Sequence, residues 1–140
     1  MISHTTRTNV YAPLRVLIYS SNASIRTRIR QVLGHLVDNR VVPMVLVDLA
    51  TAPAVMQQMV SGKTDLAILD GEASPSGGLG LAKQLKDELL QCPPIVVLTG
   101  RAEDSWLARW SRADAIIARP VDPVVLSGAV LSLLQSRLIA

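Results

Sequence analysis

Five short aliphatic runs constrain the fold of this chain more than any other feature. They are rich in Val, Ile and Leu, and they occupy residues 14–19, 44–49, 66–69, 94–98 and 115–118. Unbroken aliphatic runs of this length are typical of parallel strands that are buried on both faces of a sheet. Aromatic residues make up only 3% of the chain and Phe is absent, so aliphatic side chains must fill the interior.

A helical segment is predicted after each of these runs. In the first segment, which Asp38-Asn39-Arg40 ends, apolar residues recur at three- and four-residue steps, at Ile25, Ile29, Val32, Leu33 and Leu36. The other helices are expected from Pro53 to a stop at Gly62, and then over residues 79–90, 103–111 and 123–135. Five strands that alternate with five helices predict an α/β domain with a five-stranded, parallel, doubly wound sheet and right-handed crossovers.

The length of 140 residues is enough for one domain with its own core. Residues 1–13 show no hydrophobic periodicity, and we expect them to form a flexible N-terminal tail. The folded domain is expected at residues 14–138. No output domain is expected, because the last predicted helix ends close to the end of the sequence.

Composition argues against secretion, membrane insertion and nucleic-acid binding. No apolar stretch approaches the ~20 residues of a membrane-spanning helix, and residues 1–13 lack the apolar segment of a secretory signal. The single cysteine, Cys92, cannot form an internal disulfide, which agrees with a reducing compartment. The net charge of +3 comes without a dense basic run. We therefore expect a cytoplasmic protein that binds no nucleic acid.

Polar side chains follow four of the five predicted strands. Ser20 and Ser21 follow the first strand, Asp70 the third and Arg119 the fifth, and Thr99 ends the fourth. In an open parallel sheet the functional crevice lies outside the carboxyl ends of the strands. We therefore expect these five residues to share one edge of the sheet.

Four motifs at these strand ends resemble the receiver domain of two-component response regulators, the CheY-like superfamily. They are DLAILDG around Asp70, Gly77-Gly78-Leu79 at the start of the third helix, PPIVVLTG up to Thr99-Gly100, and ARPVDP around Arg119. Each motif is weak alone, but together and in this order they are specific. The resemblance covers roughly residues 14–138. It implies a flavodoxin-like (βα)5 receiver fold and a signalling module in a phosphorelay, not an enzyme.

The resemblance also implies a role for each strand-end residue. In this family an aspartate at the position of Asp70 accepts a phosphoryl group from a histidine kinase. Two acids at the positions of Ser20 and Ser21 hold Mg²⁺ together with that aspartate. A hydroxyl at the position of Thr99 and a lysine at the position of Arg119 contact the phosphoryl oxygens.

This chain departs from that pattern at the metal and phosphate positions. Ser20 and Ser21 are neutral, which leaves Asp70 as the only anionic ligand, so Mg²⁺ binding is expected to be weak or absent. Without the metal, the charge that builds up during phosphoryl transfer is not neutralised. Arg119 cannot lose its charge, and its planar guanidinium is suited to pairing with the Asp70 carboxylate. These changes favour a pseudo-receiver.

Each of these residues also has a structural interpretation. Asp70 precedes Gly71 and is suited to cap the loop after the third strand, although its place at a strand end favours an inherited site. Thr99 fits an ordinary strand-to-loop junction, and Arg119 fits a surface position before the rigid Pro120. Ser20, Ser21 and Asn22 are most simply explained as helix caps, and we predict that role for them.

Two tryptophans point to a partner surface. Trp106 and Trp110 lie one helical turn apart in a chain with almost no other aromatic residues. Core packing is the alternative, but Ala108 and Ser111 occupy the positions that face the sheet in receivers, which turns Trp110 outward. Exposed tryptophan is typical of interface hot spots. We expect a protein partner, or a second copy of the chain, on the face formed by the fourth helix, fifth strand and fifth helix.

Three functions are consistent with the sequence. The preferred one is an atypical single-domain receiver that acts in protein–protein interaction without Mg²⁺-dependent phosphorylation. The alternative is a working phospho-acceptor, phosphorylated on Asp70 in a two-component phosphorelay. A third is cofactor binding at the hydroxyl-rich segment 19–24, where flavodoxins hold the flavin phosphate, but no glycine or bracketing aromatic pair supports it.

Overall fold

The computed structural model describes residues 12–38, 43–100 and 105–139. Most of the predicted tail, the end of the break after the first helix, and the predicted start of the fourth helix at Glu103 lie outside these ranges. The elements, in chain order, are β1 (Leu14–Tyr19), α1 (Ala23–Asp38), β2 (Met44–Leu49), α2 (Ala52–Val60), β3 (Leu66–Asp70), α3 (Gly78–Glu88), β4 (Ile95–Thr99), α4 (Ser105–Ser111), β5 (Ala115–Ala118) and α5 (Pro123–Ile139).

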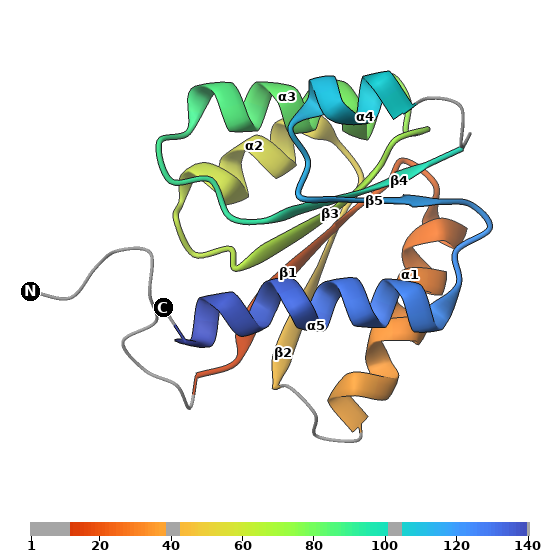
Figure 1. Cartoon of the computed structure of the whole chain (residues 1–140), viewed down its shortest axis with the longest axis vertical. Helices are drawn as coiled ribbons and strands as arrows, with labels where there is room; N and C mark the ends of the chain where they lie inside the picture. Colours follow the sequence, from red (N-terminus) through yellow and green to blue (C-terminus); the bar gives the residue numbers. More distant parts are fainter. Residues whose placement is uncertain (1–11, 39–42, 101–104, 140) are drawn as a thin grey trace, which may run out of the picture.

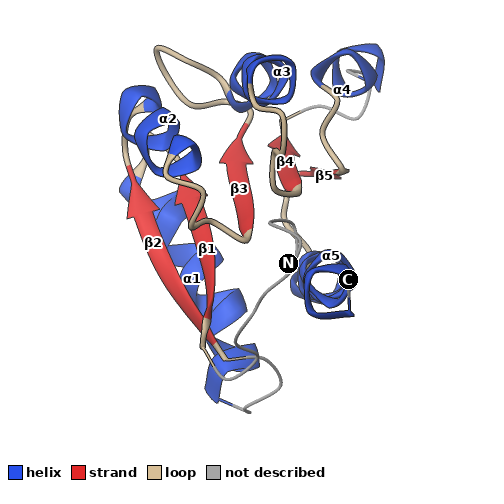
Figure 2. Ribbon diagram, turned by 90° about the vertical axis from the view of Figure 1, so that its left-hand side faces the viewer, coloured by secondary structure: helices blue, strands red, loops and turns tan. Residues whose placement is uncertain are grey.

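The five strands form one parallel sheet in the order β2-β1-β3-β4-β5 (Figures 1 and 2). Figure 1 shows α2, α3 and α4 on one face of the sheet and α1 and α5 on the other. The predicted α/β, doubly wound fold is therefore confirmed. The order reverses at β1 and β3, so the carboxyl ends of these two strands flank the point where functional crevices form in such sheets.

Strand alternation divides the core into two layers. Side chains such as Val16, Ile18 and Ile68 pack with α1 and α5, whereas Leu17 and Leu69 pack with α2 and α3. The central strands β3 and β4 are buried at every position, as expected for parallel strands covered on both faces. The edge strands β2 and β5 are partly exposed, because each has a neighbouring strand on one side only.

Helix bounds differ from the prediction by a few residues. α3 begins at Gly78 and ends at Glu88, and α5 continues to Ile139 instead of stopping at Gln135. β4 begins at Ile95 because Pro94 has no N–H to donate, although its carbonyl oxygen accepts from Ala67 N (3.0 Å). None of the described helices is both long and apolar enough to cross a membrane.

Gly78 allows α3 to begin directly against the end of β3. A Cβ atom at this position would lie 2.8 Å from both the carbonyl carbon and the oxygen of Asp70, and 2.9 Å from Leu69 Cβ. These distances are too short for a real contact, and two of the three atoms belong to backbone. Gly80, two residues later in the same helix, faces open space.

We expect the Gly78→Ala substitution to lower the free energy of unfolding by about 1–3 kcal/mol, because the added carbon overpacks the junction of β3 and α3. The matched Gly80→Ala substitution is expected to raise it by roughly 0.5–1 kcal/mol, since alanine favours the helix. Urea denaturation of both variants measures the two changes. Equal stability of the two variants would contradict the close packing of α3 on β3.

Candidate functional site at the carboxyl edge of the sheet

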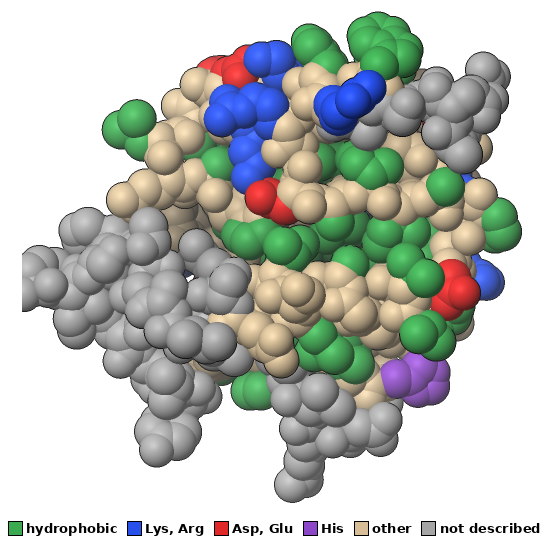
Figure 3. All heavy atoms as spheres, viewed as in Figure 1, with side chains coloured by type: hydrophobic (Ala, Val, Ile, Leu, Met, Phe, Trp, Pro, Cys, Tyr) green, Lys and Arg blue, Asp and Glu red, His purple; other side chains and the backbone are tan. Residues whose placement is uncertain are grey.

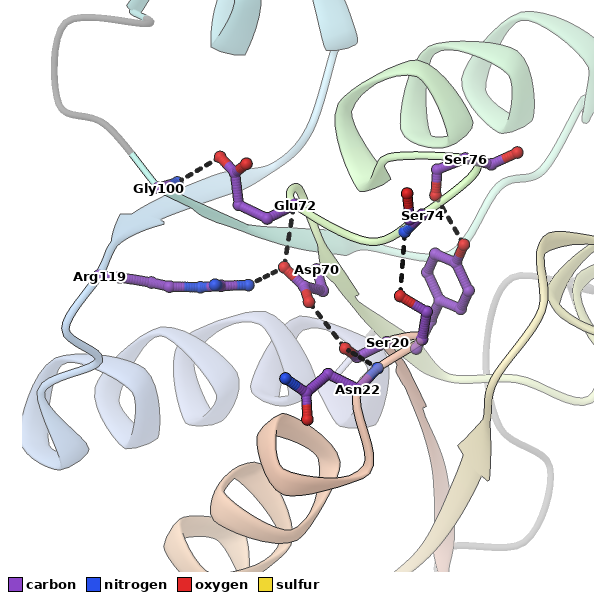
Figure 4. A network of polar contacts seen from close by, with 10 residues as sticks. Ser20, Asn22, Asp70, Glu72, Ser74, Ser76, Gly100 and Arg119 are labelled. Atoms are coloured by element: carbon purple, nitrogen blue, oxygen red, sulfur yellow. Dashed lines mark hydrogen bonds and ion pairs between the residues drawn. The ribbon is translucent and has the colours of Figure 1, made fainter.

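The sheet brings the predicted strand-end residues to one edge. Ser20 follows β1, Asp70 ends β3, Thr99 ends β4 and Arg119 follows β5. Figure 4 shows the side chains of Ser20 and Arg119 directed toward Asp70 from opposite sides. Ser20, Asp70 and Thr99 are buried, and Arg119 is partly buried. Parallel strands thus gather residues that are far apart in the sequence.

Both carboxylate oxygens of Asp70 are occupied by groups of the protein. Oδ1 is paired with Nη2 of Arg119 and also accepts from the backbone N–H of Glu72 (2.9 Å). Oδ2 accepts from the hydroxyl of Ser20 (2.7 Å). Figure 4 shows these contacts around the carboxylate. The pairing of Asp70 with Arg119 that the sequence predicts is therefore present in the structure.

This arrangement offsets the cost of burying a carboxylate. The Asp70 residue is only 2% exposed, and a buried charge is costly unless it is paired and hydrogen-bonded. Arg119 supplies the counter-charge, while Ser20 and the Glu72 N–H supply neutral donors. Arg119 is fixed in turn by its own backbone N–H, which donates to Thr99 O (2.8 Å). The Thr99 hydroxyl has no hydrogen-bond partner among the described residues.

The prediction that Ser20, Ser21 and Asn22 are helix caps is correct only for Asn22. Its carbonyl oxygen accepts from the N–H groups of Ile25 and Arg26, and its side-chain oxygen accepts from Ser24 N (2.8 Å). Ser20 instead donates to Asp70, and Ser21 accepts from Ser74 N (2.9 Å) in the loop after β3. The two serines therefore connect β1 to distant segments.

Tyr19, which the sequence did not single out, holds the same loop. Its side chain is fully buried, and its hydroxyl donates to Ser76 O (2.6 Å). Burial, and secondly the negative charge of Asp70, raise the pKa of Tyr19. Together with the contact between Ser21 and Ser74, this bond attaches the loop between β3 and α3 to the end of β1 (Figure 4).

Glu72 is a further site residue that the sequence did not indicate. Its carboxylate accepts from the backbone N–H of Gly100 (3.1 Å), directly after β4. A Cβ atom at Gly100 would collide with this carboxylate, so the Glu72 side chain would have to shift to accommodate any other residue there. Glu72 lies in a polar loop without periodicity, so no sequence pattern distinguishes it from a solvated surface acid.

The donor set at this edge is poor in metal ligands. No group of three or more His, Cys, Asp or Glu side chains is placed to hold a metal ion within residues 12–38, 43–100 and 105–139. The side-chain oxygen that contacts Asp70 is the Ser20 hydroxyl, which is already used as a donor to the carboxylate. Arg119 brings a positive charge to the position next to the carboxylate.

The tryptophans of α4 lie on the surface. Trp106 is 63% exposed and Trp110 is 46% exposed, whereas Ser111 is buried, as the helical register predicts. The side chain of Ala108 lies outside the part that the structure describes. Lys83 of α3 lies 6.0 Å from the centre of the Trp110 ring. The Trp110 ring therefore lies close to a basic side chain of α3, and the sequence did not predict this neighbour.

Figure 3 shows hydrophobic side chains at the surface over α4, close to basic side chains. Further large apolar side chains are exposed on the neighbouring elements of the predicted face, at Ile116 on β5 and at Val124 and Val125 on α5. These side chains and the two tryptophans all lie on elements of the predicted face.

Comparison with known proteins places this chain among signalling proteins. No protein-family model matches the sequence. Two response regulatory proteins of uncharacterised function, from Mycobacterium tuberculosis strains H37Rv and CDC 1551, are each 55% identical over 123 residues. These matches cover 88% of this chain and 92% of each relative.

Solved structures share the fold at lower identity. A CheY-like response regulator receiver domain protein from Methanospirillum hungatei JF-1 has a TM-score of 0.74 and 23% identity, covering 90% of this chain and 97% of that one. The signal receiver domain of an HD domain-containing protein from Pseudomonas fluorescens Pf-5 has a TM-score of 0.76 and 20% identity. That match covers 94% of this chain and 93% of the other.

We expect the Arg119→Gln substitution to lower the free energy of unfolding by about 1–3 kcal/mol, because a buried carboxylate loses its counter-charge. Chemical denaturation at neutral pH measures the change. The Asp70→Asn substitution, added to Arg119→Gln, is expected to recover part of the loss, since it removes the unpaired charge.

Arg109→Gln is the matched control, because Arg109 is exposed on α4 and the same charge is removed. Its effect is expected to stay within ~0.5 kcal/mol of the parent protein. If Arg119→Gln were no more destabilising than Arg109→Gln, the ion pair with Asp70 would not stabilise the fold.

Proposed function

Because the chain belongs to the response regulator receiver family, we propose that it is an atypical receiver that signals by binding another protein, without Mg²⁺-dependent phosphorylation. The observation that carries this proposal is the engagement of Asp70 by groups of the protein. Arg119, Ser20 and the Glu72 N–H occupy both carboxylate oxygens in the resting protein. A carboxylate in this state is a poor nucleophile, because its charge is paired and three of its roughly four lone-pair positions already accept from donors.

The residues at this edge do not fit the Mg²⁺ ion on which the family's chemistry depends. Mg²⁺ requires hard oxygen ligands, usually including more than one anionic group. Asp70 is the one carboxylate at the family's metal positions, and the guanidinium of Arg119 already pairs with it. The Ser20 and Ser21 hydroxyls are engaged with Asp70 and Ser74. We therefore propose that the protein uses no metal cofactor.

Glu72 gives further support to a closed site. Its carboxylate holds the N–H of Gly100, and its own N–H holds Asp70, so two backbone donors at this edge are used internally. The negative charge of the Glu72 carboxylate also repels an incoming phosphodonor, which is itself an anion. These internal bonds at the strand ends favour a site that keeps one conformation and does not switch.

Phosphorylation of Asp70 in a two-component phosphorelay is the second candidate function. Two observations favour it: an aspartate remains at the end of β3, and the hydroxyl of the neighbouring Thr99 lacks a partner among the described residues. In this alternative, a carboxylate oxygen of Asp70 attacks the phosphorus atom of the donor and the donor's leaving group departs. Where Oδ1 is the attacking atom, Arg119 must first release it, and where Oδ2 attacks, Ser20 must do so.

The partner surface in the preferred function is the exposed apolar face on α4, β5 and α5. Trp106 and Trp110 provide large aromatic area, and residues of this kind dominate the binding energy of interfaces. A second copy of the chain is one partner that this face suits. The partner is neither a membrane nor a nucleic acid in this proposal, and the free thiol of Cys92 supports a cytoplasmic location.

The proposed function predicts that acetyl phosphate and Mg²⁺ leave the intact mass of the protein unchanged. The combined substitutions Ser20→Asp, Ser21→Asp and Arg119→Lys are expected to restore phosphorylation, because they supply two metal ligands and free Asp70 from its ion pair. Intact-mass spectrometry after incubation detects the added phosphoryl group in either protein.

The control is Asp70→Asn in the triple variant, which is expected to abolish the added mass. A stable phosphoryl group on Asp70 of the unmodified protein would contradict the proposal and favour the phosphorelay alternative. Chemical denaturation of each variant verifies that it is folded.

Partner binding or self-association is expected to weaken about tenfold or more in a Trp110→Ala variant, because truncation of an interface tryptophan typically costs ~2 kcal/mol. Sedimentation and co-purification measure association, and thermal melting measures stability. The fold should be retained, since Trp110 is largely exposed.

Val60→Ala is the matched control, because Val60 is an exposed apolar residue on α2, away from this face. Asp70→Ala should also leave association unchanged. Loss of association in Asp70→Ala with no effect of Trp110→Ala would show that binding depends on the strand-end site.

A further inference from the structure

Positive charge flanks the two exposed tryptophans of α4. Figures 1 and 2 show α4 beside α3 on the same face of the sheet. Nζ of Lys83 on α3 lies 6.0 Å from the centre of the Trp110 ring. Arg109 follows Trp106 by three residues, so helical spacing places it on the other side of Trp106 from Trp110. The aromatic pair therefore lies between two cations.

Arg109 is available to a partner. It is exposed, and its side chain forms no hydrogen bond or ion pair with the described residues. The acids Glu103 and Asp104, which precede α4 in the sequence, lie outside these residues. An exposed guanidinium of this kind is suited to bind a carboxylate through two parallel hydrogen bonds.

Positive charge also exceeds negative charge where α3 and α4 pack together. Glu88 does not belong to this contact, because it lies one turn after Gln84, which lines a hollow beside Ala52 of α2. Two carboxylates and four cations of the described residues remain at the contact; they are Asp87, Asp114, Lys83, Lys86, Arg109 and Arg112. Two positive charges are thus in excess.

Both of these carboxylates are already used by the protein. Asp87 accepts from Nζ of Lys83 (2.5 Å) and from Nη1 of Arg112 (3.0 Å). Asp114 accepts from Nζ of Lys86 (2.7 Å) and from a backbone N–H of β4 (2.7 Å). The excess of cations at this contact therefore persists in the described part of the chain.

We propose that the α3–α4 surface, formed by the two tryptophans with Lys83 and Arg109, binds an acidic segment of a partner protein that also carries an apolar side chain. The apolar side chain packs on the indole rings, and carboxylates on either side of it pair with the two cations. This inference rests on the proposed function and deepens it, because it names the chemistry of the partner that meets the tryptophans.

Two other occupants fit this surface less well. A second copy of the chain, bound through the same surface, brings cations against cations, and like charges across an interface are unfavourable. A nucleic acid normally requires a denser basic stripe, and its phosphates are repelled by Asp87, whose side chain is 42% exposed.

The test uses intrinsic fluorescence, because Trp106 and Trp110 are the only tryptophans of the chain. The full chain is titrated with an acetylated and amidated peptide of sequence Asp-Asp-Leu-Phe-Asp-Asp. We expect a saturable change of tryptophan emission with a dissociation constant of roughly 1 mM or below. The peptide Lys-Lys-Leu-Phe-Lys-Lys has the same apolar centre, and we expect it to bind at least about tenfold more weakly.

A double variant tests the two cations. Lys83→Gln combined with Arg109→Gln should weaken binding of the acidic peptide about fivefold, because each exposed pair contributes modestly. Lys63→Gln combined with Arg28→Gln is the matched control. Both of its residues are exposed and lie outside α3 and α4, so it removes the same charge and should bind as the parent does. Circular dichroism verifies that each variant is folded.

Four outcomes would overturn the proposal. They are unchanged emission up to about 10 mM acidic peptide, some ten times the expected dissociation constant, equal binding of the two peptides, parent-like binding by the Lys83 and Arg109 double variant, and equally tight binding of a six-nucleotide oligodeoxythymidine. Dissociation of a dimer in sedimentation as the peptide binds would likewise assign the surface to a second copy.

These results are separate from the proposed function as a whole. Equal binding of the two peptides would remove the preference for an acidic partner, while the Mg²⁺-independent receiver would stand. A stable phosphoryl group on Asp70 would contradict the proposed function, whereas binding of the acidic peptide at the tryptophans would be unaffected by it.

Discussion

A single buried carboxylate organises the functional edge of this domain. Asp70 ends the central strand β3, and its burial requires a counter-charge and hydrogen-bond donors within reach. These come from three segments: Ser20 after β1, the Glu72 N–H in the next loop, and Arg119 after β5. Because each partner comes from a different segment, satisfying one charge fixes the relative positions of several loops.

The same edge is closed by contacts that do not involve Asp70. Tyr19 and Ser21 bind the loop after β3 through Ser76 and Ser74, and Glu72 binds Gly100 after β4. The loops at the carboxyl ends of β1, β3 and β4 are therefore joined to each other by hydrogen bonds within the protein. Such internal bonding suits a protein whose surface, more than its chemistry, carries the signal.

The sequence was sufficient for the fold because burial on both faces leaves a simple pattern. β1, β2 and β5 coincide with their aliphatic runs, in which Arg15 and Asp48 are the only charged residues. The end of the last helix was harder to predict from the sequence. Val124 and Val125 are apolar yet exposed, so periodicity does not separate its buried face from its surface.

The site was only partly predictable, because its residues act over long separations in sequence. The local pattern around Ser20 and Ser21 matches a helix cap, but their partners Asp70 and Ser74 lie 50 and 53 residues away. Glu72 has no local signal at all, since its role depends on the neighbouring strand bringing Gly100 within reach. Strand order and loop conformation, which decide such contacts, are not encoded in hydrophobic periodicity.

Gly100 makes the contacts at this edge sensitive to mutation. Any side chain at this position displaces the Glu72 carboxylate, and a single-base change in a glycine codon is enough to introduce one. One substitution at Gly100 can therefore alter the bonding of the loop after β3 while Asp70, Ser20 and Arg119 stay unaltered, so the contacts at this edge can be changed one at a time.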